Sequence, residues 1–335
     1  MSSHLHNPRV LVTGAGGPAG VSVIRSLNAE ACVFAIDIDP CAVGLYLVGS
    51  ERRALVPRGE DFDFVDRIID LCRRWQIDVV VPTVDTELLP FADGRERFKE
   101  LGVEVIVASK PALSICLDKW LLACTVELTV RCPVTYLIDV EFDPLVFPSW
   151  PSIAKPRQGS GSRGVQMLDG PEDLSRVPRD GSFILQEYLP GEELSVDVYV
   201  DRSGQPIGAV PRTRLKVDSG VSVAGRTVRD DDAIQLALDT VATVGLTGPA
   251  NVQCRRDYDG RLALLEVNPR FPGSLPLTIA AGFNIPKLAL SESLGYSVDR
   301  LVSFDEIGIV RHWEDVIIHA DAIAEMSAAV EGRVA

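Results

Sequence analysis

The chain has 335 residues, 46% of them hydrophobic, and a net charge of −14. This length predicts two or three folding units, and the acidic balance disfavours nucleic acid and anionic lipid as general partners. No apolar run approaches membrane-spanning length, and the N-terminus lacks the apolar core of a signal peptide. Seven cysteines without a Cys-x-x-Cys pair and four scattered histidines favour reduced thiols and disfavour a zinc site. We therefore expect a cytoplasmic protein that acts on small molecules.

The first 112 residues alternate short apolar strands with amphipathic helices. Val21–Leu27 and Phe62–Trp75 have apolar residues at helical spacing. The apolar runs that predict strands begin at Arg9 and continue with Cys32–Asp37, Asp78–Pro82 and Val103–Ala108. This alternation predicts an α/β domain, residues 1–112, with a Rossmann-like, doubly wound parallel sheet.

A glycine-rich loop, Thr13–Gly20, follows the first strand and opens a helix. It fits the G-x-G-x-x-G/A pattern of dinucleotide-binding domains, with Asp37 at the end of the next strand. This pattern leaves open an NAD-dependent oxidoreductase, or glycines that serve only close packing. Ligands of open α/β sheets bind at the carboxyl ends of the strands. We therefore expect Gly16, Gly17 and Glu87 to contact substrate.

The rest of the chain predicts an α+β arrangement with antiparallel sheets. Expected helices are Asp118–Leu128 with Asp118 as its N-cap, Ala233–Val244 capped by an aspartate run at 230–232, Leu277–Ala281, Ile285–Leu294 and a short Ala-rich tail. Expected strands are Ser152–Lys155, Val165–Leu168, Phe183–Leu189, Leu194–Val200, Ile207–Leu215 and, late in the chain, Gly308–Ile318. The change of pattern separates this α+β part of the chain from the first domain.

A second glycine-rich loop lies between two of these strands, within Ile153–Val165. The residues whose backbone N–H groups could cover phosphate oxygens are Gly159, Ser160, Gly161 and Gly164. Lys155, just before the loop, is a suitable point charge for a phosphate. The alternative is a surface hairpin that binds nothing.

The segment Gln186–Glu193 ends a strand at Pro190-Gly191. A bend there leaves backbone N–H and C=O groups that could contact the edge of an adenine ring. Glu193, just beyond the bend, could accept hydrogen bonds from ribose hydroxyls. An ordinary acidic turn is the alternative for this segment.

The most informative segment is Gly248–Arg270, in which Asp259-Gly260 predicts a two-residue type I′ hairpin. With that loop, Tyr258 pairs with Arg261, Gln253 with Glu266, and Asn251 with Asn268. Side chains alternate along strands, so the acid and the amides share one face. The opposite face is expected to be core and consists of Val252, Cys254, Leu265 and Val267. Such oxygen ligands suit Mg²⁺ bound with phosphates, although polar outer faces are also common in antiparallel sheets.

Taken in this order, these motifs resemble the ATP-grasp superfamily. The hairpin Asn251–Arg270 is especially similar to the synthetase units of the carbamoyl phosphate synthetase large chain. The resemblance covers nearly the whole chain. It implies a pre-ATP-grasp domain at 1–112, a lid domain at 113–190, and a large ATP-grasp domain with the metal site at 191–335.

The resemblance also implies roles for individual residues. Lys119 and Lys155 match phosphate-binding lysines. The hinge Glu187–Leu189, with Tyr188 between its ends, matches the segment whose backbone holds adenine, and Glu193 matches the ribose-binding acid. The remaining matches are Gln253, Glu266 and Asn268 as Mg²⁺ ligands, with Glu266 between two ions, and Arg270 as an arginine that stabilises the phosphorylated intermediate.

This resemblance implies an ATP-dependent carboxylate–amine ligase with ATP and Mg²⁺, two ions in all, as cofactors and Mn²⁺ as a substitute. Because the chain has one synthetase unit, we expect a stand-alone enzyme that forms an amide through an acyl phosphate, with amino-acid-like substrates. Arg212, Arg214 and Lys216 lie at spacing two and could reach the γ-phosphate or the acceptor, unless they form a solvated face. Ser274 could contact the donor carboxylate.

Three alternatives to this ligase remain open. The first is a carboxylate- or carbamate-phosphorylating enzyme of the carbamoyl phosphate synthetase type. The second is the NAD-dependent oxidoreductase that the first glycine loop suggests, and the third is a non-catalytic nucleotide-binding module. A homodimer is expected by analogy with ligases of this type.

Overall fold

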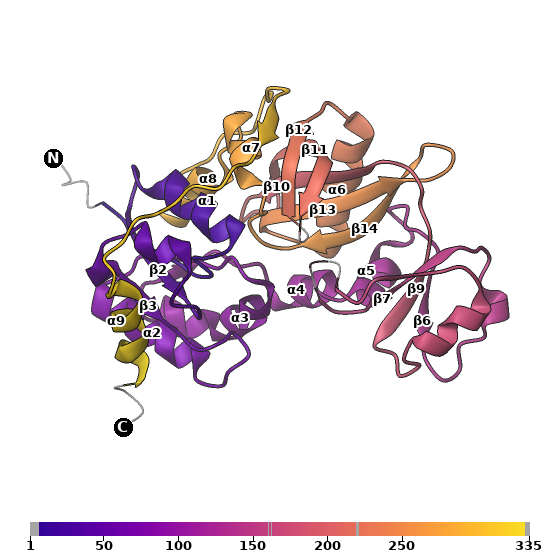
Figure 1. Cartoon of the computed structure of the whole chain (residues 1–335). Helices are drawn as coiled ribbons and strands as arrows, with labels where there is room; N and C mark the ends of the chain where they lie inside the picture. Colours follow the sequence, from indigo (N-terminus) through magenta and orange to yellow (C-terminus); the bar gives the residue numbers. More distant parts are fainter. Residues whose placement is uncertain (1–6, 160, 162, 219–220, 332–335) are drawn as a thin grey trace. The chain divides into compact units, whose positions relative to one another are not determined.

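The computed structural model describes residues 7–159, 161, 163–218 and 221–331. They form two compact units (Figure 1). The first unit comprises residues 1–110, 270–299 and 311–335, and the second comprises residues 111–269 and 300–310. The first unit is therefore assembled from three separate stretches of the chain. The three expected domain ranges, 1–112, 113–190 and 191–335, stay a prediction.

The first unit is built on a five-stranded sheet in the order β3-β2-β1-β4-β5, in which every pair of strands is parallel. Its strands are β1 (Arg9–Val12), β2 (Cys32–Asp37), β3 (Arg53–Leu55), β4 (Val79–Val81) and β5 (Glu104–Val105). The central strands are buried because parallel strands are covered by helices on both faces, which explains their continuous apolar runs. The predicted doubly wound parallel sheet is confirmed.

Six α-helices accompany this sheet in the described part of the first unit. They are α1 (Pro18–Leu27), α2 (Phe64–Trp75), α3 (Asp85–Lys99), α7 (Leu275–Ala280), α8 (Ile285–Ser293) and α9 (Ala322–Glu331), and two 3₁₀ turns occupy Val43–Tyr46 and Ser50–Arg52. Helix α8 packs on α1, where Ser26 Oγ donates to Asn284 Oδ1 over 2.9 Å and Lys287 pairs with Glu30 over 2.5 Å. The late helices thus belong to the same unit as the first helix.

The second unit contains two antiparallel sheets. The smaller, in the order β6-β9-β7-β8, consists of β6 (Thr135–Ile138), β7 (Ser152–Pro156), β8 (Gln166–Leu168) and β9 (Phe183–Glu187). The larger, in the order β14-β13-β10-β11-β12-β15, consists of β10 (Glu193–Val200), β11 (Pro206–Asp218), β12 (Val221–Thr227), β13 (Gly248–Arg256), β14 (Leu262–Asn268) and β15 (Gly308–Val310). These antiparallel sheets were expected.

The helices of the second unit are α4 (Lys110–Cys116), which begins at the boundary between the units, α5 (Lys119–Val126) and α6 (Asp231–Val244). Two 3₁₀ turns, at Pro144–Val146 and Pro171–Arg176, flank the strands of the smaller sheet. Both expected N-caps are present: Asp118 accepts hydrogen bonds from Trp120 and Leu121 N–H groups, and Asp230 accepts one from Ala233 N–H. A capping carboxylate satisfies donors that the first helical turn leaves unpaired, which fixes where each helix begins.

The hairpin between β13 and β14 confirms the predicted pairing of the polar residues but corrects the predicted turn. The loop has one residue more than expected, because Asp257 N–H donates to Arg261 C=O and Gly260 N–H closes on Asp257 C=O. The left-handed conformation of Gly260, with φ of 78°, suits a three-residue loop. The predicted pair of Tyr258 and Arg261 is therefore wrong.

A β-bulge cancels this one-residue difference. Between Gln253 and Cys254 the register shifts, so that Cys254 faces Leu264 while Gln253 still faces Glu266. The extra residue is Leu265, which was expected in the core; instead it lines a pocket, because a bulged residue is not held to the alternation of the strand.

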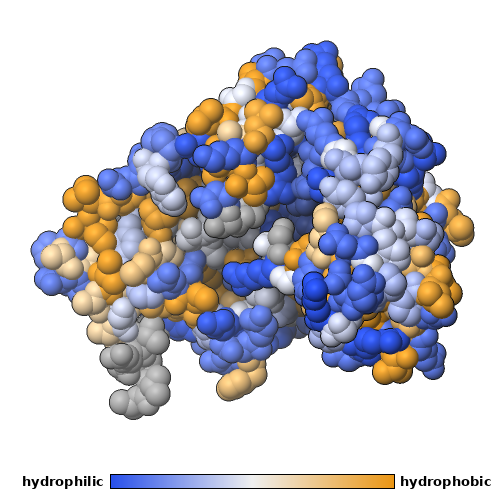
Figure 2. All heavy atoms as spheres, turned by 45° about the vertical axis from the view of Figure 1, so that its right-hand side comes forward, coloured by the Kyte–Doolittle hydropathy of each residue, from blue (hydrophilic) through white to orange (hydrophobic). Residues whose placement is uncertain are grey.

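The late strand was also predicted too long. Gly308–Val310 alone is strand, at the edge of the larger sheet, and the rest of the expected Gly308–Ile318 has no regular structure. No helix in the part of the chain that the structure describes has the length and apolarity needed to cross a membrane. On the face in Figure 2, hydrophobic residues are interspersed with hydrophilic ones.

Candidate functional site

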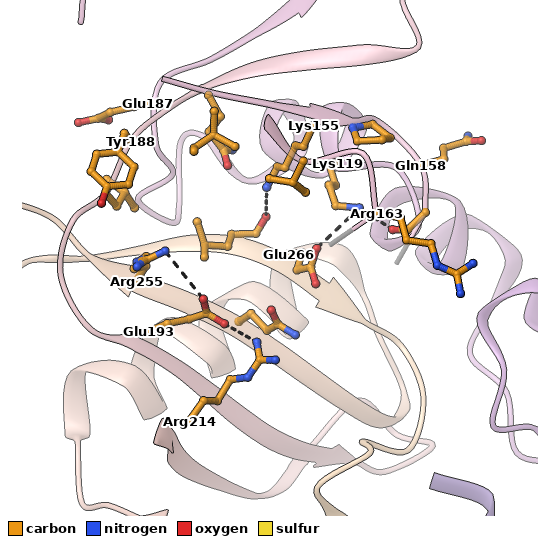
Figure 3. A pocket seen from close by; sticks show the side chains of 18 residues that line it. Lys119, Lys155, Gln158, Arg163, Glu187, Tyr188, Glu193, Arg214, Arg255 and Glu266 are labelled. Atoms are coloured by element: carbon orange, nitrogen blue, oxygen red, sulfur yellow. Dashed lines mark hydrogen bonds and ion pairs between the residues drawn. The ribbon is translucent and has the colours of Figure 1, made fainter. Parts of the chain in front are cut away.

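A pocket in the second unit collects most of the nucleotide-binding residues expected from the sequence (Figure 3). Its lining comes from α5, from both sheets and from the loops that follow β7 and β9. The expected residues that line it are Lys119, Lys155, Gly159, Glu187, Tyr188, Leu189, Glu193, Arg214, Gln253 and Glu266. We call this the candidate nucleotide pocket. It brings basic, acidic and amide side chains together with the apolar Ile153, Val165 and Leu265.

Lys119 is positioned by the start of α5. Its backbone N–H donates to Arg157 C=O over 2.9 Å, and the Arg157 guanidinium pairs with the capping carboxylate of Asp118 over 2.6 Å. These contacts tie the helix to the strand that carries Lys155. The Lys119 ammonium then lies 3.6 Å from the Glu266 carboxylate and donates to Gly159 C=O over 2.7 Å.

Lys155 is a buried cation, with only 8% of its surface exposed. Burial lowers its pKa to about 8, although the Glu266 carboxylate opposes this shift. Its ammonium donates to Leu265 C=O over 3.4 Å, a carbonyl at the bulge. A weakly hydrated ammonium beside an accessible pocket is suited to binding phosphate, since the anion would restore the charge compensation that water no longer provides.

The hinge after β9 is held at both of its sides. Glu187 N–H donates to Val134 C=O over 2.9 Å, and its carboxylate accepts from Val134 N–H over 3.2 Å. Gly191 N–H donates to Arg256 C=O over 3.0 Å, and a Cβ at Gly191 would lie 2.7 Å from that same carbonyl oxygen. Only glycine permits this approach. Tyr188 and Leu189, between these anchors, line the pocket.

Glu193 is flanked by two arginines that point toward it in Figure 3. Arg214 approaches one carboxylate oxygen to 2.6 Å, and Arg255 approaches the other to 4.0 Å. The three residues face one another because Glu193 on β10 pairs with Arg255 on β13, and Arg214 lies on the neighbouring β11. Arg255 was not identified from the sequence, although its spacing of two from Gln253 placed it on the same face.

The expected cation ligands come together on one face of the larger sheet. Gln253 faces Glu266 directly, and the Asn268 amide lies 3.5 Å from a Glu266 carboxylate oxygen. Among the described residues no group of three His, Cys, Asp or Glu side chains could hold a metal ion, so a cation here would need the two carboxamides. A carboxylate with two amide oxygens fits a hard cation such as Mg²⁺.

The three basic residues of β11 have different surroundings. Arg212 is buried against Asp197, with contacts of 3.2 to 3.3 Å, whereas Arg214 lines the pocket. Lys216 is exposed. A register shift between Arg214 and Lys216 interrupts the strict alternation that would have placed all three side chains on one face.

The glycine loop after β7 lies partly in the pocket. Gly159 lines it, together with Gln158 and Arg163, which were not identified from the sequence. The expected Ser160 lies outside the described residues. Gly161 and Gly164 have positive φ values of 70° and 75°, a conformation that favours glycine.

Backbone N–H groups of the glycine loop in the first unit already donate to acceptors within that unit. Gly16 N–H donates to Asp37 Oδ2 over 2.8 Å, so the acid that a dinucleotide-binding domain would offer to ribose occupies an N–H of the loop itself. A Cβ at residue 16 would lie 2.8 Å from the Cβ of Ala42. Close packing against Ala42 therefore explains why residue 16 is a glycine. Gly17 N–H closes the turn on Gly14 C=O. This arrangement disfavours the nicotinamide alternative.

Glu87 is buried in the first turn of α3, with 5% of its surface exposed. The hydroxyl of Thr13, the residue that follows β1, donates to its carboxylate. Burial raises the pKa of Glu87 to about 8, and the charges of Asp37 and Glu60 add to this rise. An acid that stays protonated at neutral pH can donate a hydrogen bond as well as accept one.

Arg270 is held by a two-contact ion pair with Asp85, at 2.8 and 3.1 Å, in the first unit. Asp85 begins α3 and was not identified from the sequence as a partner. Ser274, at the start of α7, is buried. The roles expected for Arg270 and Ser274 in catalysis stay predictions.

Two family models match the sequence. Residues 179–316 match a model described as "ATP-grasp in the biosynthetic pathway with Ter operon". Residues 10–106 match the model of the PylC-like N-terminal domain. These matches confirm the predicted resemblance to ATP-grasp proteins.

Among curated proteins, the chain is 26% identical over 254 residues to the carbamoyl phosphate synthase large chain of Kocuria rhizophila. The alignment covers 67% of this chain and 23% of that protein, so the chain spans about a quarter of the length of this relative.

Two solved structures share the fold. The biotin carboxylase domain dimer of 2-oxoglutarate carboxylase from Hydrogenobacter thermophilus, in complex with MgADP, ADP and bicarbonate, has a TM-score of 0.71 at 18% identity and covers 89% of this chain and 71% of its own. An L-amino acid ligase from Bacillus licheniformis has a TM-score of 0.68 at 16% identity, covering 86% and 74%. The expected fold class is therefore confirmed.

Proposed function

The chain carries a PylC-like N-terminal domain followed in the sequence by an ATP-grasp domain, and from this premise we propose that it is an ATP-dependent carboxylate–amine ligase. The reaction joins a small carboxylate to an amine through an acyl phosphate and releases ADP and phosphate. The substrates are amino-acid-like. The L-amino acid ligase that shares its fold supports this choice of substrate class.

One observation carries the proposal: two lysines, a hinge with apolar neighbours and a set of oxygen ligands line the same pocket. This is the combination that a magnesium nucleotide requires, since the phosphates need cations and the base needs an apolar slot with backbone groups. Lys119 and Lys155 bind the phosphates, the hinge Glu187–Leu189 holds adenine, and Glu193 holds the ribose.

The residues Gln253, Glu266 and Asn268 hold Mg²⁺, for which Mn²⁺ can substitute. A cation held by these residues would supply positive charge to the triphosphate. Lys119 makes this charge arrangement possible because its ammonium already lies 3.6 Å from Glu266. It therefore bridges the cation ligands and the phosphates.

Catalysis then consists mainly of positioning and electrostatic stabilisation. The substrate carboxylate oxygen attacks the γ-phosphorus, and the bond to the β-γ bridging oxygen breaks. The amine next attacks the acyl carbon, and phosphate leaves with one oxygen of the original carboxylate. Arg270, oriented by Asp85, stabilises the charge that develops on the acyl phosphate, and the glycine loop after β7 excludes water.

The loops at the carboxyl edge of the parallel sheet supply the substrate contacts in this proposal. Glu87 is the strongest candidate there, because a carboxyl group whose pKa is raised to about 8 can donate to a substrate oxygen. Ser274, buried at the start of α7, is the second candidate on the substrate side, whereas the N–H groups of Gly16 and Gly17 already have partners within the first unit.

The test is an isotope-transfer experiment. A panel of amino acids and dipeptides is screened for ADP release with Mg²⁺ and ATP, and the active carboxylate is then labelled with ¹⁸O. The ligase reaction transfers one label from the carboxylate to inorganic phosphate and yields an amide that mass spectrometry detects. ADP release without label in phosphate, across active substrates, would refute the acyl-phosphate route.

A second candidate, a carboxylate- or carbamate-phosphorylating enzyme, is favoured by the similarity to carbamoyl phosphate synthase large chains. The two candidates differ in their need for an amine. A phosphorylated product that accumulates when no amine acceptor is present would support the second candidate over the ligase.

A further inference from the structure

A buried chain of polar side chains lies behind Gln253 and serves no role described so far. Asn251 and Asp197 face each other on β13 and β10, and both are buried, with 4% and 0% of their surfaces exposed. Asn251 Nδ2 donates to Asp197 Oδ1 over 2.7 Å. Gln253 Nε2 in turn donates to Asn251 Oδ1 over 3.4 Å. This series of hydrogen bonds therefore ends at Gln253, a candidate cation ligand.

The direction of these hydrogen bonds is set by Asp197. An ionised carboxylate can only accept, so it takes the NH₂ end of the Asn251 amide. The oxygen of Asn251 is then turned toward Gln253 and takes the NH₂ end of that amide. Gln253 is left with its oxygen on the side away from Asn251.

The buried guanidinium of Arg212 completes the arrangement. It pairs with both oxygens of Asp197 at 3.2 to 3.3 Å, and it is itself 4% exposed. A buried carboxylate without such a partner would be costly. Arg212 thus supports Asp197, whereas the sequence suggested a direct contact with phosphate or acceptor.

We propose that Asp197 and Asn251 are positioning residues that present the Gln253 side-chain oxygen, rather than its NH₂ group, to a divalent cation. The inference rests on the proposed function, because it assumes a cation held by Gln253 and Glu266. It assigns a use to two buried residues that do not line the candidate nucleotide pocket. Outer partners of metal ligands affect affinity by orienting them.

Orientation matters for a carboxamide ligand but not for a carboxylate ligand. A carboxamide has one coordinating end and must be oriented, whereas a carboxylate has two equivalent oxygens. Replacing Gln253 by glutamate therefore removes the need for orientation. The contribution of Asn251 to cation affinity is expected in the glutamine background and absent in the glutamate background.

The experiment measures Mn²⁺ binding in the presence of ADP, by the loss of the free Mn²⁺ electron paramagnetic resonance signal. The full-length variants are Asn251→Leu, Gln253→Glu and the double variant. Asn251→Leu keeps a similar volume and leaves the Asp197–Arg212 pair intact. We expect it to weaken Mn²⁺ binding about tenfold, and to change binding less than twofold once residue 253 is glutamate.

Ser195→Ala is the matched control. Ser195 pairs with Gln253 across β10 and β13, is 1% exposed, and its hydroxyl has no hydrogen-bond partner among the described residues. This variant tests whether any substitution next to Gln253 weakens Mn²⁺ binding. We expect its Mn²⁺ affinity to equal that of the wild type. Thermal unfolding of each variant verifies folding, and Asn251→Ala replaces the leucine variant if that one does not fold.

Equal losses of Mn²⁺ affinity in the glutamine and glutamate backgrounds would overturn the orientation role, as would unchanged binding in Asn251→Leu. A wild-type protein that binds no Mn²⁺ with ADP would instead refute the proposed function. The two failures are therefore distinguishable.

Discussion

The candidate nucleotide pocket of the second unit and the sheet edge of the first unit each contain a buried titratable group, but in different surroundings. Lys155 lies in a pocket with charged groups of both signs, and its ammonium has Glu266 and Glu193 nearby. Glu87 has the Thr13 hydroxyl as a hydrogen-bond partner and two other acids as neighbours. Burial shifts both pKa values toward neutrality, to about 8 in each case.

The two sites differ in whether their polar groups are available to a ligand or are already paired within the protein. The pocket places cations beside anions whose oxygens can exchange partners, an arrangement that suits a ligand bearing phosphates and metal ions. At the sheet edge, by contrast, polar groups are engaged with each other: Asp85 with Arg270, Asp37 with Gly16, Glu87 with Thr13. The comparison predicts large functional effects in the pocket and effects on stability at Glu87.

The largest effect is expected for Glu266→Ala. Loss of the only carboxylate among the three cation ligands should lower ATP turnover by about a thousandfold or more. The measurement is ADP release with the active substrate pair. Glu141→Ala, an exposed acid in a turn of the same unit, is the control and should retain normal turnover. Turnover near the wild-type level in Glu266→Ala would refute the metal assignment.

Lys155→Met is expected to weaken nucleotide binding about a hundredfold, because the buried ammonium is replaced by a neutral chain of similar length. The melting temperature should stay equal or rise, since burial of a charge is unfavourable in the absence of ligand. Calorimetric titration with ADP and a thermal unfolding scan give both values. A large loss of stability with intact nucleotide affinity would assign Lys155 to the structure instead of the ligand.

Glu87→Gln sharpens the comparison through pH. Because the folded pKa of Glu87, about 8, exceeds its ordinary value, the favourable protonated form is fully present below about pH 4.5 and is lost as the pH rises through 8. The glutamine variant lacks this loss. It should therefore gain on the order of 4 kcal/mol of unfolding free energy relative to wild type between pH 5 and pH 9. Denaturant unfolding at both values provides the measurement, and parallel pH profiles would contradict the prediction.

The smallest effect is expected for Gly260→Ala in the hairpin loop. Its φ of 78° is unfavourable for alanine, while no atom lies within 4 Å of the added Cβ, so the cost is conformational. We expect a loss of about 1 kcal/mol in unfolding free energy and unchanged turnover. Gly260→Asn, which tolerates this conformation better, should lose less. A loss of turnover with either variant would mean that the loop controls the register of Gln253 and Glu266.

The candidate pocket could be predicted from the sequence to a large extent because antiparallel strands place side chains by simple alternation. Gln253 and Glu266 were paired correctly although the loop was one residue longer than predicted, since the bulge at Leu265 restored the register. The bulge itself has no simple sequence signal. Arg255 could have been found by extending the same alternation.

The sheet edge of the first unit was less predictable because loops and long-range pairs form it. The pair of Asp85 with Arg270 joins residues 185 positions apart, which no local pattern reveals. Helix α3 was missed as well. It has Pro90 in its interior, and its charged and apolar residues do not separate into two faces. The buried Asp197 was likewise indistinguishable from a surface acid, since strand alternation does not report burial depth.

The discontinuous first unit has a consequence for how the protein is made. Its early strands emerge from the ribosome long before α7, α8 and α9, yet α8 packs on α1 and α9 contacts β3 (Figure 1). Residues 111–269 of the second unit are synthesised before α7 and α8, and residues 300–310 before α9. The apolar surface of α1 therefore stays uncovered until α8 has been synthesised. Vectorial translation thus favours completion of the second unit before the first.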